Sequence, residues 1–166
     1  RNQTLFKNKK MKNCSWYYEM QSLGYNYRMN DILSALGMSQ LNQIKKFIKK
    51  REYIFNYYKT NLDTKYLKLQ HISSNVRSSY HLAVTTYKNK ISKKLVFKKF
   101  LNNGIKLQTH YIPIHLHPYF KKLGFKKKQF PVCENYYENS FSLPLYYGLN
   151  LQDLKKVVKV TKDIFY

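Results

Sequence analysis

The sequence predicts an α/β domain in which a long helix is followed by a small sheet covered by helices. Two observations support this fold class. Apolar residues recur at helical spacing from Asp31 to about Lys59, which predicts one continuous helix. Farther along the chain, three runs rich in β-branched and aromatic residues, near Tyr80, Ile105 and Phe141, alternate with helical patterns. We therefore expect these three runs to be strands of one sheet.

A polar turn precedes the long helix. Gly24 permits a tight bend, Asn30 can accept hydrogen bonds from free backbone N–H groups, and Asp31 places a negative charge at the positive end of the helix dipole. We expect residues 1–30 to form a connecting segment and this motif turn, and residues 31–166 to form the α/β domain.

Local patterns and turn residues predict the later elements. Asn103-Gly104 and Gly124 are typical of helix ends, and Pro113 closes an apolar run. We expect strands at 66–71, 78–87, 105–112 and 141–146, and helices at 92–102, 118–123, 134–139 and 151–164. The last helix is amphipathic and closes the domain.

The composition narrows the class of protein. A chain of 166 residues with 43% hydrophobic and 17% aromatic residues can bury one core, which excludes general disorder. No run of about 18 apolar residues is present, so we expect no membrane span. The two cysteines, Cys14 and Cys133, form no CxxC motif, and a reducing cytoplasm fits them.

The formal net charge of +23 raises the alternative of a basic nucleic-acid-binding domain. The lysines, however, are scattered over four separate stretches of the chain, at 7–12, 45–50, 93–99 and 121–128. We therefore favour a solvated basic surface, and nucleic-acid binding stays as the less favoured alternative.

Polar groups that can carry chemistry gather at two places, Asn26 to Arg28 and His110-Tyr111. His81 lies in a predicted strand, where a hydrogen-bonded structural histidine is the simpler interpretation. His115 and His117 follow His110 closely, but a metal site needs three or four convergent ligands, and no cysteine or acidic residue is adjacent to this run. We therefore expect no metal site.

The stretch around the turn resembles the hallmark segment of the DegT/StrS-type nucleotide-sugar aminotransferases. This segment reads WYYEMQSLGYNYRMNDILSALGMSQLNQIKKFIKKR. Three later stretches of the chain resemble successive later segments of that family, in the same order: SSYHLAV, NNGIKLQTHYIPIHLHPYFKKLGF and ENYYENSFSLPLYYGL. The combination of YEMQ, HYIP and PYF is most similar to the branch that aminates a UDP-linked 4-keto-6-deoxy sugar on the route to pseudaminic acid.

The resemblance implies a fold-type I homodimer that uses pyridoxal 5′-phosphate (PLP) to move an amino group from glutamate to a UDP-linked keto-sugar. In this family the large domain carries the lysine that forms a Schiff base with PLP and most of the phosphate contacts. The present chain resembles the C-terminal half, which begins after those parts. We therefore expect that none of its lysines is the Schiff-base lysine and that the isolated chain is inactive.

Four residues match family positions near the ligands. Asn26 matches the asparagine that reaches the PLP phosphate of the other subunit, and Arg28 matches the arginine that faces the partner's substrate pocket. His110 and Tyr111 match the pair near the substrate. The structural alternatives are a turn amide for Asn26 and an ion pair for Arg28. The functional alternative within the family is an inactive remnant that serves as a dimerisation module.

Overall fold

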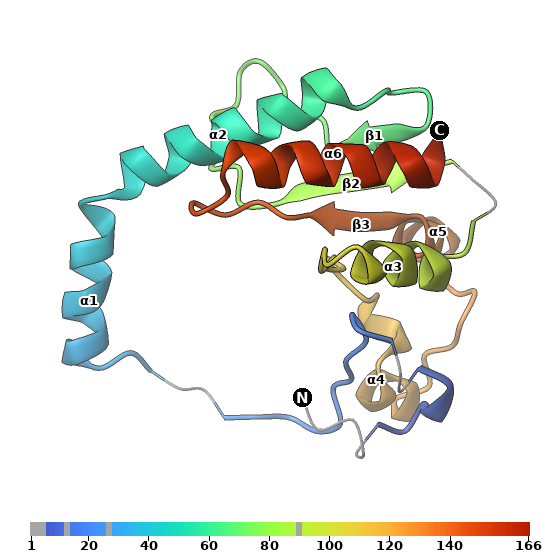
Figure 1. Ribbon diagram of the computed structural model, residues 1–166. Coiled ribbons are helices and arrows are strands. Elements are labelled where there is room, and N and C mark those ends of the chain that lie inside the picture. The colour runs from blue at the N-terminus through green and yellow to red at the C-terminus, as the bar shows by residue number, and fades with distance from the viewer. Residues whose placement is uncertain (1–5, 12–13, 26–27, 89–90) are drawn as a thin grey trace.

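The computed structural model describes residues 6–11, 14–25, 28–88 and 91–166. The helices are η2 (Lys9–Met11), α1 (Asp31–Leu41), α2 (Ile44–Asn61), α3 (Lys93–Asn102), η3 (Ile114–Leu116), α4 (Pro118–Lys122), α5 (Pro131–Glu138) and α6 (Leu151–Phe165), and the strands are β1 (Leu67–Leu69), β2 (Ala83–Tyr87) and β3 (Ser140–Leu143). Figure 1 shows that the sheet and most helices form one body, from which α1 stands apart. The predicted α/β fold class is confirmed.

The three strands form one antiparallel sheet in the order β1-β2-β3. Thr85 of β2 lies opposite Phe141 of β3, and Val84 lies opposite Ser142. Because side chains alternate along a strand, Thr85 and Phe141 point to one face of the sheet, whereas Val84 and Ser142 point to the other. The ring of Phe141 and the hydroxyl of Ser142 therefore lie on opposite faces of the sheet.

The aromatic face of the sheet packs against α3 and α6. The ring of Phe141 lies 5.7 Å from that of Phe100 in α3 and 5.9 Å from that of Phe165 in α6. Tyr87 of β2 contacts Phe165 from the same side, with ring centroids 5.2 Å apart. Burial of these large rings accounts for much of the apolar surface that stabilises the body.

The prediction of one continuous helix from Asp31 to Lys59 is wrong, because the helix is interrupted at Asn42 and Gln43. The backbone N–H of Gln43 donates to Gln40 O at 3.0 Å, a three-residue spacing that tightens the chain into a turn before α2 begins. Gly37, a residue type with low helix propensity, stays helical. The interruption falls between α1, which buries no residue, and α2, which packs on the body.

The segment 105–112 is not the predicted strand. Only Gln108 pairs with the sheet, through an isolated bridge to Ser142, with N–H···O distances of 3.4 and 2.8 Å. The N–H of Ile105 is already bonded to Phe100 O, where it closes the end of α3. The predicted strand at 78–87 likewise pairs only from Ala83, whereas the strand at 66–71 and the helices at 92–102 and 151–164 are confirmed with small differences at their ends.

The aromatic segment before the turn belongs to the core of the body. The indole of Trp16 lies 4.2 Å from the ring of Phe97, and its Nε1–H donates to Tyr137 Oη at 3.3 Å. Both Trp16 and Tyr17 are buried. The chain therefore leaves the body only after these residues, and α1 lies farther along it, apart from the body (Figure 1).

Candidate functional site

A pocket of about 430 Å³ lies beside Ser142, where α2, β3 and the segment 105–110 meet. It is lined by Arg51, His81, Leu82, Lys106, Gln108, His110, Ser142, Leu143, Pro144, Leu145 and Tyr146. The bridge between Gln108 and Ser142 brings the predicted residue His110 to the edge of β3. The lining contains two permanent cations and two imidazoles but no carboxylate.

His110 is held in this pocket by the sheet. Its Nδ1 lies 2.8 Å from Ser142 Oγ, and Ser142 itself is buried, so the hydroxyl fixes the orientation of the imidazole. Burial lowers the pKa of His110, and the neighbouring His81 lowers this pKa further, because a second positive charge here is unfavourable. The ring is therefore neutral near pH 7, and its Nε2 is the nitrogen left for a further hydrogen bond.

Tyr111 lies beside His110 but outside the pocket lining. The two rings meet edge to face with centroids 4.8 Å apart, and the peptide bond between them is cis. The side chain of Tyr111 is 62% exposed. Its phenol is therefore available to a ligand or to another polypeptide that covers this surface.

Arg51 is a residue of the pocket that the sequence analysis missed. Its Nη1 lies 3.3 Å from Nδ1 of His81, and since a guanidinium can only donate, Nδ1 of His81 accepts in this contact. Arg51 precedes the buried residues Ile54, Phe55 and Tyr58 of α2 by three, four and seven positions. A charged residue on the apolar stripe of a helix is the signal that points to it.

The other predicted residues do not lie in this pocket. Arg28 is exposed and precedes α1, which Figure 1 shows apart from the body. Asn26 lies outside the described residues. The structure thus brings His110 together with Arg51 and His81, whereas Arg28 belongs to a different region of the chain.

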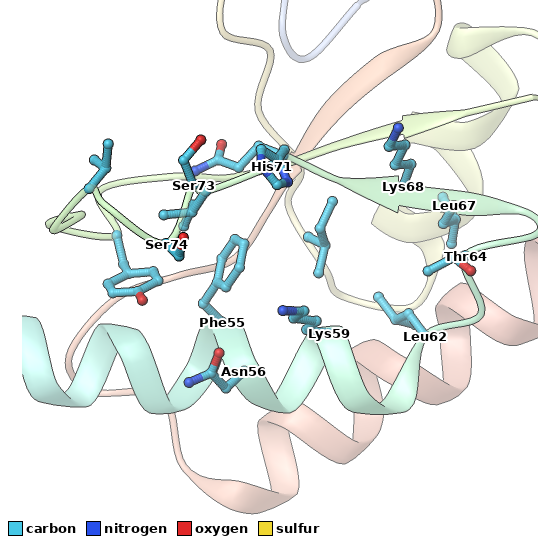
Figure 2. A pocket seen from close by; sticks show the side chains of 15 residues that line it. Phe55, Asn56, Lys59, Leu62, Thr64, Leu67, Lys68, His71, Ser73 and Ser74 are labelled. Atoms are coloured by element: carbon cyan, nitrogen blue, oxygen red, sulfur yellow. The ribbon is translucent and has the colours of Figure 1, made fainter.

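A second cleft, of about 480 Å³, lies between α2 and the segment that runs from β1 to Tyr80. Figure 2 shows Phe55, Lys59 and Leu62 rising from the helix toward the strand, whereas Lys68 points away from the helix. None of Arg28, His110 and Tyr111 lines this cleft. Its lining mixes apolar side chains with polar ones such as Asn56, Lys59 and His71. The pocket at His110 is therefore favoured by the predicted residue that it contains, and not by a larger number of polar groups.

Comparison with known proteins identifies the family. A profile of the DegT/DnrJ/EryC1/StrS aminotransferase family matches residues 2–162. The chain belongs to this family. It is 34% identical to the spore coat polysaccharide biosynthesis protein SpsC of Bacillus subtilis over 95% of its length. It is also 34% identical, over 86% of its length, to the UDP-4-amino-4,6-dideoxy-N-acetyl-β-L-altrosamine transaminase of Campylobacter jejuni.

Solved structures of DegT/DnrJ/EryC1/StrS aminotransferases have the same fold. PseC of Helicobacter pylori, an aminotransferase of pseudaminic acid biosynthesis, superposes with a TM-score of 0.76 at 31% identity over 89% of the chain. The sugar aminotransferase Spr1654 of Streptococcus pneumoniae superposes with a TM-score of 0.77 in its PLP form and 0.78 in its pyridoxamine phosphate (PMP) form. These matches confirm the predicted family and its link to PLP.

The chain spans only part of these relatives. It covers 42% of the length of SpsC, 38% of the Campylobacter transaminase and 40% of PseC. The predicted resemblance to a portion of the DegT/DnrJ/EryC1/StrS enzymes is therefore confirmed.

Among the described lysines, Lys93 has the pKa that its surroundings shift most, because burial lowers this pKa to about 7. Its Nζ, however, is buried and donates to the carbonyl oxygens of Tyr137 and Ser140. Lys93 lines neither of the two clefts described above. These two hydrogen bonds give Lys93 a structural role between α5 and β3.

Two further histidines, His115 and His117, have structural partners. His115 Nε2 lies 2.9 Å from Glu134 Oε1 in a buried pair, and His117 Nδ1 accepts the N–H of Met20 at 3.2 Å. In the described part of the chain, no three His, Cys, Asp or Glu side chains gather as metal ligands. Over the same residues, no helix combines the length and apolar character that a membrane crossing requires.

Proposed function

We propose that this chain is the C-terminal part of a PLP-dependent aminotransferase that moves an amino group from glutamate to a UDP-linked 4-keto-6-deoxy sugar used in surface glycans. The observation that carries this proposal is the family match over residues 2–162, together with the polar pocket that holds His110. The specific substrate is favoured by the 34% identity to the Campylobacter transaminase, whose name states its sugar product.

In this proposal PLP, when bound, carries the amino group between donor and acceptor. The residues of this chain bind and orient the other groups. His110 is neutral and held by Ser142, so it can hydrogen-bond a sugar hydroxyl or hold a proton at Nε2. Tyr111 lies beside it and extends the surface that faces the substrate. Asn26 is proposed to donate to the cofactor phosphate, and Arg28 to bind an anionic group of substrate across the subunit interface.

The remaining parts of the site are proposed to come from outside this chain. α1 supports this view, because none of its residues is buried and Ile32 and Leu36 are 80% and 57% exposed. Exposed apolar surface of this kind marks a contact with another polypeptide. We propose that the amino-terminal half of the enzyme and a second subunit cover this surface, and that the amino-terminal half carries the cofactor lysine and most phosphate contacts. The enzyme would then be a cytoplasmic homodimer.

The deciding experiment is reconstitution. We expect the purified chain alone to bind no PLP covalently and to transfer no amino group, and to support both once the proposed amino-terminal half is supplied. Borohydride reduction followed by peptide mapping, and single-turnover amination of the UDP-4-keto sugar with glutamate, measure the two properties. A specific PLP–lysine adduct on the isolated chain, with turnover, would contradict the proposal. A reconstituted complex that folds but stays inactive would favour the inactive dimerisation module.

Substitutions in the reconstituted enzyme separate the proposed roles. Asn26→Ala should chiefly weaken PLP retention, whereas Arg28→Ala and His110→Ala should lower turnover of bound substrate by about tenfold or more, as loss of a charge-assisted or oriented hydrogen bond does. Arg77→Ala and His71→Ala are the matched controls, because both side chains are exposed and neither lines the pocket at His110. Equal losses in controls and test variants would remove the assigned roles.

The nucleic-acid alternative has its own test. The net charge of +23 is expected to give weak binding to DNA or RNA that is indifferent to sequence and disappears as salt rises. Gel-shift titrations at two salt concentrations measure this dependence. Tight, sequence-selective binding that survives near-physiological salt would make nucleic-acid binding the preferred function.

A further inference from the structure

Arg51 differs from the other described basic residues because it has a buried side-chain nitrogen that lacks a hydrogen-bond acceptor. The residue is half-buried on α2, next to the packed residues Ile54 and Phe55. Its Nε is buried and has no hydrogen-bond acceptor, and its Nη1 lies 3.3 Å from Nδ1 of His81. In the described part of the chain, the ion pair that the structure contains joins His115 and Glu134 and does not involve Arg51.

A half-buried guanidinium without an acidic partner has unused donors. Arginine carries five N–H groups in a planar fork, and a buried N–H left without an acceptor costs about 1–3 kcal/mol. Most of the other basic side chains are exposed, where water satisfies them. Arg51 instead lines a pocket of about 430 Å³, into which an acceptor group can enter.

Other donors surround the same pocket. Lys106 lines it from the segment that follows α3, His81 from the segment before β2, and His110 from the end of the bridge to β3. No Asp or Glu is among the lining residues. Positive and neutral donors that converge on a concave site with no counter-charge provide a binding environment for an anion.

We propose that Arg51, His81 and Lys106 form a binding site for an oxyanion, the carboxylate or phosphate group of a ligand, beside His110. The guanidinium supplies the fork that matches two oxygens of such a group, and Lys106 adds a compact charge from the other wall. This inference deepens the proposed function, on which it rests for the natural ligand: a carboxylate would come from the amino donor and a phosphate from the sugar nucleotide.

The competing explanation is that Arg51 serves only to hold His81 and α2 together. In that case the pocket would attract anions no more strongly than the rest of a chain with a net charge of +23. The experiment therefore has to distinguish a specific site from general attraction, and it has to work without PLP or turnover.

The test is anion binding by the 166-residue chain at constant ionic strength, with glutamate and inorganic pyrophosphate as separate probes. Long-range ¹H–¹⁵N spectra of the imidazoles report the site. Saturable shifts should appear at His81 and His110 and be absent at the exposed His71 and the buried His115 and His117. Because this pattern is measured on the unsubstituted chain, it does not depend on whether a variant folds.

Substitutions then identify the donor. Arg51→Gln should weaken binding of the preferred probe by about 10- to 100-fold, the effect of losing charge-assisted hydrogen bonds. Lys50→Gln is the matched control, because it removes the same charge from the adjacent residue of α2, which does not line the pocket. Arg51→Lys keeps the charge but loses the fork, and should bind with intermediate affinity.

Each outcome has a defined meaning. Binding of glutamate alone indicates a carboxylate site, binding of pyrophosphate alone a phosphate site, and binding of both a general oxyanion site. Equal affinity of Arg51→Gln and Lys50→Gln, or shifts spread evenly over all five histidines, would overturn the inference. Anion binding needs no cofactor, so it can be observed even if reconstituted transamination fails. Transamination can likewise be observed even if the isolated chain binds no anion, so the two proposals are tested independently.

Discussion

Helices α1 and α6 begin in the same way but differ in what they bury. Asn30 caps α1 by accepting the N–H of Leu33 at 3.0 Å, and Asn150 caps α6 by accepting the N–H of Asp153 at 2.9 Å. α1 nevertheless buries no residue, whereas α6 buries six, among them Leu154, Val157 and Phe165. Local signals therefore start both helices, and only α6 gains the packing that normally stabilises a helix in a folded protein.

The comparison also separates two uses of apolar residues. Ile32 in α1 is 80% exposed, whereas Leu154 in α6 is fully buried. The apolar surface of α6 is satisfied within this chain, against α2 and α3. That of α1 is available for contacts with other polypeptides, which agrees with the proposed assembly of the enzyme.

The sharpest test of this contrast is one substitution made in each helix. Leu154→Ala should lower the free energy of unfolding by about 2–5 kcal/mol, because it leaves a cavity in the core. Leu36→Ala in α1 should change it by no more than about 0.5 kcal/mol, because its side chain is 57% exposed and alanine favours helix. Urea unfolding followed by circular dichroism measures both values. Equal losses would mean that α1 packs on the body in solution.

A second difference concerns charge, because the body contains a buried cation. Burial lowers the pKa of Lys93 to about 7 in the folded protein, below the ordinary value near 10.5 that the unfolded chain retains. Between these values the unfolded state binds more protons, so stability should rise with pH, by about 2 kcal/mol from pH 7 to pH 9. Well below pH 7 Lys93 is protonated in both the folded and the unfolded state, so its effect on stability no longer changes with pH.

The control for this prediction lies one residue away. Lys93→Met should remove the rise, and Lys94→Met, at an exposed position, should keep it. Urea unfolding at several pH values gives the slopes, and the difference between the two variants cancels titrating groups that neither substitution affects. Identical pH dependence in both variants would show that Lys93 is not buried as a titrating group.

The smallest expected effects concern the two caps. Asn150→Ala removes a capping box in which the side chain of Asp153 also accepts the N–H of Asn150, and it should destabilise the body by about 1 kcal/mol. Asn30→Ala removes a similar bond but should leave global unfolding nearly unchanged, because α1 is not packed. Instead, amide hydrogen exchange in the first turn of α1 should become faster. Global destabilisation by Asn30→Ala as large as that by Asn150→Ala would remove the distinction between the helices.

The sequence by itself determined most of the elements of this protein, because their signals are local. The helix from Lys93 begins at Ser92, whose hydroxyl accepts the N–H of Leu95, and it ends before Gly104, which adopts a positive φ of 72°. The helical spacing of apolar residues and the residues at the two ends were therefore sufficient to predict that helix. The family resemblance was likewise readable, because ordered motifs survive in sequence without any knowledge of packing.

The tertiary structure decided which of these elements pack and where polar groups meet. Apolar residues recur at helical spacing both in α1, which is exposed, and in α2, which packs on the body. The sequence pattern therefore could not predict the interruption at Asn42 or the exposure of α1. Arg51, His81 and His110 lie about 30 residues apart along the chain, and no local pattern relates them. They share a pocket because α2 packs on the body and Gln108 bridges to Ser142, and such contacts depend on the fold of the whole chain.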